Sequence, residues 1–133
     1  MTGGLVAIVC GGRDFHAPAL VYRALDGFHS RTPIGALVHG AARGADALAA
    51  AWAAERGIRE VAFPADWAAD GKRAGPIRNA RMLAFIMDHA ERAVVAFPGG
   101  SGTAHMVRIA QSAGVPTWEM SFAWEKTNGG GTP

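Results

Sequence analysis

The chain has 133 residues, which is enough for one domain with a buried core. Half of the residues are hydrophobic and 18% are charged, which excludes an intrinsically disordered chain. The formal net charge is only +2 and no run of lysines and arginines occurs, so a surface dedicated to duplex DNA is not expected.

Apolar runs and glycine turns alternate along the first half of the chain. A β-rich run over residues 5–10 predicts a strand that is buried on both faces, and the spacing after it predicts a helix over 18–29. A second strand is expected over 34–38, and an alanine-rich run predicts a helix over 45–56 that stops at a glycine. Residues 60–63 form the third expected strand.

The second half begins with a polar segment over residues 64–76, which contains two glycines and two prolines. We expect a long loop there, of a length that is often functional. A helix over 77–89 and a strand over 93–97 should follow, and 115–118 is the last expected strand. We expect a domain over 1–120 and a flexible tail over 121–133, where three consecutive glycines occur.

The turn after the fourth strand, from Pro98 to Thr103, leads directly into a helical apolar pattern that includes Met106 and Ile109. Glycines let a ligand approach the backbone, and the first amides of a helix have no partner within the helix. Such a place can hold a phosphate, to which Ser101 and Thr103 could add hydroxyl donors. A glycine turn can also serve packing alone.

Five strands that alternate with four helices predict an α/β fold, a doubly wound Rossmann-like parallel sheet with helices on both faces. In such sheets, ligands bind beyond the carboxyl ends of the strands, where the strand order reverses. With the order 3-2-1-4-5, the turns that begin at Gly11 and Pro98 would face each other across one crevice. The pair of turns therefore favours an anionic ligand.

Five motifs in order resemble the SLOG superfamily of Rossmann-like domains, in its YspA and cpYpsA-related branch. They lie at residues 11–15, 40–46, 63–67, 71–79 and 97–103. The resemblance implies a nucleotide-derived ligand, such as an ADP-ribose-like molecule or a nucleoside phosphate, and self-association as a homodimer or higher homo-oligomer. No cofactor is implied.

Two relatives of this superfamily suggest alternative functions. The cytokinin-activating LOG phosphoribohydrolases have a turn similar to Pro98–Thr103, but glutamates follow it, one of them catalytic, where this chain has His105 and Met106. DNA-processing protein A, which binds single-stranded DNA, has a turn similar to residues 40–46. This chain lacks the clustered lysines and aromatic residues that such binding normally uses.

Several side chains near the turns have both a ligand-binding and a structural interpretation. Arg13 and Arg43 could contact phosphate or form surface salt bridges, and Asp14 could hold a ribose hydroxyl or cap the first helix. Asp46 could favour the helix dipole or contact a sugar. Arg78 is expected at the start of its helix, where a cation opposes the dipole, and such a local conflict favours ligand binding.

Trp67 is expected to plug the loop onto the core more than to stack on a base. His105 could donate a proton or point to solvent, and neither it nor His39 has metal-ligand spacing. Cys10, the only cysteine, is expected to be buried; no internal disulfide is possible, and a cytoplasmic protein without a membrane span is expected.

The sequence therefore predicts a nucleotide-binding domain, with a nucleotide hydrolase or a single-stranded nucleic-acid binder as alternatives. The candidate catalytic residues, if a reaction occurs, are Asp46, Asp66 and His105. The candidate ligand-binding residues are Gly11, Gly12, Arg13, Asp14, Gly40, Arg43, Gly44, Asp46, Lys72, Arg78, Asn79, Pro98, Gly99, Gly100, Ser101, Gly102 and Thr103.

Overall fold

A computed structural model describes residues 4–121, so most of the tail expected over 121–133 lies outside the described residues. The sheet has five parallel strands in the order β3-β2-β1-β4-β5, as predicted. The strands are β1 (Leu5–Cys10), β2 (Ile34–His39), β3 (Arg59–Ala62), β4 (Arg92–Ala96) and β5 (Thr117–Glu119).

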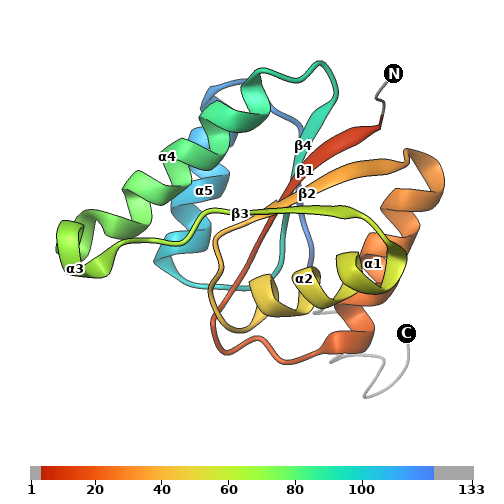
Figure 1. Cartoon of the computed structure of the whole chain (residues 1–133), viewed down its shortest axis with the longest axis horizontal. Coiled ribbons are helices and arrows are strands. Elements are labelled where there is room, and N and C mark those ends of the chain that lie inside the picture. Colours follow the sequence, from red (N-terminus) through yellow and green to blue (C-terminus); the bar gives the residue numbers. More distant parts are fainter. Residues whose placement is uncertain (1–3, 122–133) are drawn as a thin grey trace.

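The helices cover both faces of this sheet (Figure 1). They are α1 (Pro18–Arg31), α2 (Ala45–Arg56), α3 (Trp67–Asp70), α4 (Ala74–Met87) and α5 (Ser101–Ser112), with a 3-10 turn, η1, over Gly71–Arg73. Alternate residues of β1 divide the core: Ala7 and Val9 pack with α1 and α2, whereas Ile8 and Cys10 pack with α4 and α5. This alternation is what a strand buried on both faces requires.

The segment over residues 64–76 is not the long loop that its polar composition predicts. Asp66 caps α3 by accepting a hydrogen bond from the amide of Ala69 at 3.1 Å, and α4 already begins at Ala74. Pro76 fits in the first turn of α4, because the amide it lacks would have no partner there. Arg78 therefore lies in the second turn of the helix, and the expected conflict with the helix dipole does not arise.

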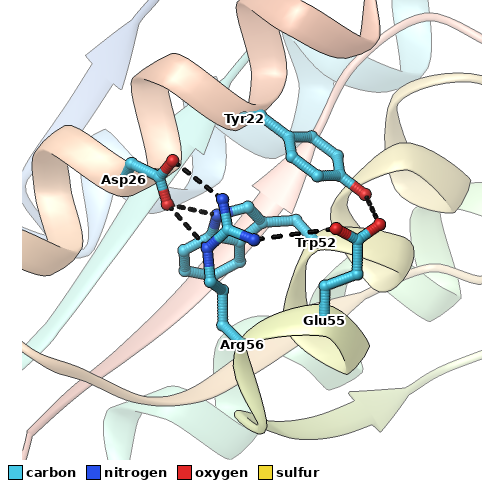
Figure 2. Close-up of polar contacts among 5 residues, drawn as sticks. All are labelled: Tyr22, Asp26, Trp52, Glu55 and Arg56. Carbon is cyan, nitrogen blue, oxygen red and sulfur yellow. Dashed lines mark hydrogen bonds and ion pairs between the residues drawn. The ribbon is translucent and has the colours of Figure 1, made fainter.

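A polar cluster joins α1 to α2 on one side of the sheet (Figure 2). Asp26 accepts hydrogen bonds from Arg56 and from the indole of the fully buried Trp52, at 2.8 Å for the indole. Tyr22 donates to Glu55 at 2.6 Å. The Arg56 guanidinium is the main reason why the pKa of Asp26 is lowered, and its hydrogen bond to Asp26 raises its own pKa. These contacts fix the layer of helices that carries α2 toward the site.

Candidate functional site

A cleft of about 1080 Å³ opens beyond the carboxyl ends of β1 and β4, where the strand order reverses. This volume is at the upper end of the range for small-molecule pockets. The cleft is lined by both glycine turns and by side chains from α2, α3, α4 and α5. This is the position at which doubly wound sheets bind their ligands.

The two glycine turns meet at the floor of the cleft, as the sequence predicts. The amide of Gly12 donates to the carbonyl of Pro98 at 2.8 Å. A Cβ at Gly99 would lie 2.7 Å from the Gly12 nitrogen and 2.2 Å from the Thr103 hydroxyl, and one at Gly12 would lie 3.0 Å from the Pro98 oxygen. Backbone therefore packs directly on backbone here, an approach that only residues without a side chain allow.

The amino terminus of α5 points its free amides into this region. Gly100 is the N-cap residue and makes no side-chain cap, and the amide of Ala104 is the first that bonds back along the helix, to Gly100 at 3.0 Å. Among the described residues no backbone or side-chain acceptor is bonded to the amides of Ser101, Gly102 and Thr103. Open amides at a helix start, together with the helix dipole, favour an anion.

A buried amide connects α4 to the start of α5. Asn79 is 3% exposed; its Oδ1 accepts from Arg78 Nε at 2.9 Å, and its Nδ2 donates to the Gly102 carbonyl at 3.1 Å and to His105 Nδ1 at 3.0 Å. Because Asn79 Nδ2 only donates, His105 Nδ1 must accept, and the imidazole carries its proton on Nε2. Burial, with Arg108 as the second cause, lowers the pKa of His105, so the neutral donor form prevails at neutral pH.

Arg78 presents a cation to the cleft from α4. Its Nη1 donates to the carbonyl of Gly40 at 2.7 Å, and its Nε is held by Asn79. Burial lowers its pKa, which the nearby Asp46 partly offsets, but an arginine stays charged at physiological pH. Its Nη2 has no hydrogen-bond partner among the described residues and is available to a ligand.

Asp46 is a buried carboxyl that also lines the cleft, with 6% exposure. Its Oδ2 accepts from the amides of Gly40 at 3.0 Å and Ala42 at 3.3 Å, which fixes the turn before α2. No described residue donates to Oδ1. Burial is the main cause of a raised pKa, opposed by these amides and by His39 and Arg78. This side chain therefore supports the turn and also offers one free oxygen to the cleft.

His39 is nearly buried at the end of β2 and serves the same turn. Its Nδ1 accepts from the amide of Ala41 at 2.9 Å, and its Nε2 lies 2.5 Å from Glu60 Oε2. An imidazole that accepts at Nδ1 carries its proton on Nε2, so His39 donates to Glu60. His39 is thus a structural residue, and it does not line the cleft.

Not all predicted residues reach the cleft. Asp14 does not cap α1, whose N-cap residue is Ala17; it forms an exposed ion pair with Arg43 at 3.4 Å. Arg43 and Asp66 do not line the cleft, and Asp66 is the cap of α3. The predicted residues that line it are Gly11, Gly12, Arg13, Asp14, Asp46, Lys72, Arg78, Asn79, His105 and residues 98–103.

Gly40 and Gly44 support the site from behind. A Cβ at Gly40 would lie 2.2 Å from Arg78 Nη1. Gly44 has φ +78°, and a Cβ there would lie 2.2 Å from the carbonyl oxygen of Gly12 and 2.5 Å from that of Arg13. Both glycines therefore let the turn before α2 pack against groups that line the cleft.

Sequence reasoning missed two side chains on the wall of the cleft, Trp67 and Arg108. Trp67 is 49% exposed, so it does not plug the core as predicted. Its exposure depends on how α3 is oriented, for which the sequence gives no signal. Arg108 follows His105 by three residues in α5, and this helical spacing could have shown that both lie on one face.

Cys10 is buried, as predicted, at the end of β1. Burial raises the pKa of its thiol to about 12, with Asp46 as the second cause. A thiol with this pKa stays protonated and is a poor nucleophile at neutral pH. Within residues 4–121, no helix is long and apolar enough to cross a membrane, and no three potential metal-ligating side chains gather.

Comparison with known proteins assigns the chain to a family. The model of the YspA, cpYpsA-related SLOG family matches residues 6–69, which contain the turn after β1, the Asp46 turn and Trp67. The chain is also 39% identical over 119 residues to the Gene 61 protein of Mycobacterium phage D29, with 82% of this chain and 90% of that protein covered. The chain belongs to the YspA, cpYpsA-related SLOG family.

Proposed function

We propose that this protein binds a nucleotide-derived small molecule, such as a nucleoside monophosphate or ADP-ribose, in the cleft beyond β1 and β4. The observation that carries the proposal is the meeting of the two glycine turns beside the open amides of α5, with Gly12 bonded to Pro98 at 2.8 Å. A phosphate on Ser101, Gly102 and Thr103 would receive backbone hydrogen bonds and the favourable end of the helix dipole.

Cations on the walls of the cleft complement a phosphate. Lys72 and Arg108 line it, and Arg78 has a free Nη2 and a position fixed by Gly40 and Asn79. A guanidinium that is already held in place loses little side-chain entropy when it binds an anion. The Nε2 proton of His105 adds a neutral donor.

The free oxygen of Asp46 suits a ligand hydroxyl. A buried carboxyl oxygen without a donor carries a desolvation cost, which a ribose hydroxyl would relieve by donating to it. A ligand that carries both a phosphate and a ribose would therefore satisfy α5 and Asp46 at once.

Calorimetry with adenosine monophosphate and ADP-ribose tests the proposal. Gly100→Asp should abolish binding, because the new carboxylate would occupy the amides and repel the phosphate. Nothing lies within 4 Å of a Cβ at Gly100, and aspartate is a favourable N-cap residue, so the variant should fold at least as stably as the wild type. Gly27→Asp adds the same charge at an open position in α1 and should leave binding intact. Unchanged binding in Gly100→Asp would refute the proposed phosphate position.

A second candidate function is cleavage of an N-glycosidic or phosphoester bond, favoured by Asp46. A buried carboxyl with a raised pKa, next to a cleft, is a suitable general acid. The glutamates of the LOG enzymes are replaced here by His105 and Met106, so the acid would have to come from another element.

Chromatography of adenosine monophosphate and nicotinamide adenine dinucleotide after incubation with the protein tests this activity. Product release should disappear in Asp46→Asn, which keeps an oxygen for the amides of Gly40 and Ala42. Intact substrates after prolonged incubation with the wild type would reject hydrolysis of these two compounds.

A further inference from the structure

Trp67 is exposed at the cleft although a tryptophan side chain has much apolar surface to bury. It is 49% exposed, and it begins α3, whose first turn is fixed by the Asp66 cap. A tryptophan buries up to about 250 Å² when it is packed, so leaving half of it in solvent forgoes a large hydrophobic contribution. Packing alone therefore does not explain its position on the cleft wall.

Arg13 faces the same ring from the opposite wall. Its guanidinium carbon lies 5.1 Å from the centre of the Trp67 ring, within the range of a cation–π contact. Arg13 is exposed and has no hydrogen bond or ion pair among the described residues, so it can move to admit a ligand. Near the Cη2 edge of the ring lies Gly75, where even a Cβ would be 3.5 Å away. The face and the edge of the ring are thus bordered by groups that leave room.

We infer that Trp67 and Arg13 form a seat for the planar base of a nucleotide, in the same cleft as the proposed phosphate position on α5. This inference rests on the proposed function and narrows it to ligands that carry an aromatic base as well as a phosphate. An indole and a guanidinium both stack on nucleobases, and the stack tolerates any base because each has a π face. The seat therefore separates nucleotides from sugar phosphates but discriminates weakly among bases.

Three probes separate the base from the phosphate: adenosine monophosphate, uridine monophosphate and ribose 5-phosphate. Calorimetry should show that both nucleotides bind the wild type more tightly than ribose 5-phosphate does. Trp67→Leu should weaken adenosine monophosphate roughly tenfold, as expected for the loss of one base stack, and leave ribose 5-phosphate within about twofold. Trp67→Phe keeps a ring and should fall between the wild type and Trp67→Leu.

Trp118 provides the matched control, since it is 51% exposed but lines a different pocket at the other edge of the sheet. Trp118→Leu should leave the affinities for all three probes unchanged. Adenosine monophosphate should also quench part of the tryptophan fluorescence of the wild type, and Trp67→Phe should remove that quenching while Trp118→Leu keeps it.

Equal affinity of the wild type for adenosine monophosphate and ribose 5-phosphate would overturn the base seat and leave the phosphate position standing. Equal weakening of both probes by Trp67→Leu would overturn it as well, because the residue would then act on the fold or on the phosphate. If none of the three probes binds the wild type, the base seat fails together with the proposed function.

Discussion

Gly44→Ala should separate the two glycine turns, and its cost can be worked out from the backbone. Gly44 has φ +78° and ψ −128°, a conformation that is essentially restricted to glycine, so alanine should cost about 1–3 kcal/mol in strain. Its Cβ would lie 2.2 Å from the Gly12 oxygen, 1.2 Å short of the 3.4 Å at which ordinary contact begins. The neighbour is backbone and cannot rotate away, so the turn after β1 must shift.

That shift would break a hydrogen bond as well. The Gly12 carbonyl accepts from the amide of Ala45 at 3.1 Å, and losing a typical hydrogen bond costs about 1 kcal/mol. Strain and hydrogen bond together give roughly 3 kcal/mol, or a fall in Tm on the order of 10 °C for a domain of this size. Urea unfolding followed by circular dichroism measures the difference.

Two other glycines separate the terms of this prediction. Gly57 has φ +68° but nothing within 4 Å of its Cβ, so Gly57→Ala should cost only about 1 kcal/mol, from the backbone alone. Gly27 lies in α1 with open space and no positive φ, and Gly27→Ala should stabilise the fold by about 0.5–1 kcal/mol. If Gly44→Ala destabilises no more than Gly57→Ala, the close approach of the two turns is not a determinant of stability.

Three further predictions concern titratable groups. The pKa of Asp26 is lowered chiefly by Arg56, so its contribution to stability is present above the unfolded pKa of about 3.8 and is lost as the pH falls through the lower folded value; Asp26→Asn should flatten unfolding free energy against pH in that acidic range. His105, with its pKa lowered, should titrate below 6.5 in a carbon-detected NMR experiment and show the Nε2–H tautomer, and Asn79→Ala should mix the tautomers. Cys10, with its pKa raised to about 12, should resist iodoacetamide at pH 8 in the folded protein and react once urea unfolds it; rapid labelling of the folded state would contradict its burial.

The sheet could be predicted from the sequence because its strands are short apolar runs between glycine turns. Residues 5–10 are apolar throughout, as a strand with helices on both faces must be, and the structure has β1 at those residues. The alternation of strands and helices then leaves few strand orders, so the meeting of Gly12 with Pro98 followed from topology. Hydrophobic periodicity carries both inferences.

Residues 64–76 could not be predicted in this way, because short helices at a surface have no apolar stripe. The N-cap bond of Asp66 and the first-turn position of Pro76 are local devices that start helices, but the same residues are also common in loops. The exposure of Trp67 depends on the direction of α3, and the partners of Asn79 lie in a helix that is distant in the sequence. Such contacts are fixed by tertiary structure and leave no trace in composition.

The division of the core by β1 has a practical consequence for finding the ligand. The layer of α1 and α2 and the layer of α4 and α5 both border the cleft, so an occupant would be held by both halves of the molecule at once. A compound present at 100 times its Kd should then raise the free energy of unfolding by about 2.7 kcal/mol. Melting curves recorded against a library of metabolites would thus reveal the natural guest without any knowledge of its chemistry.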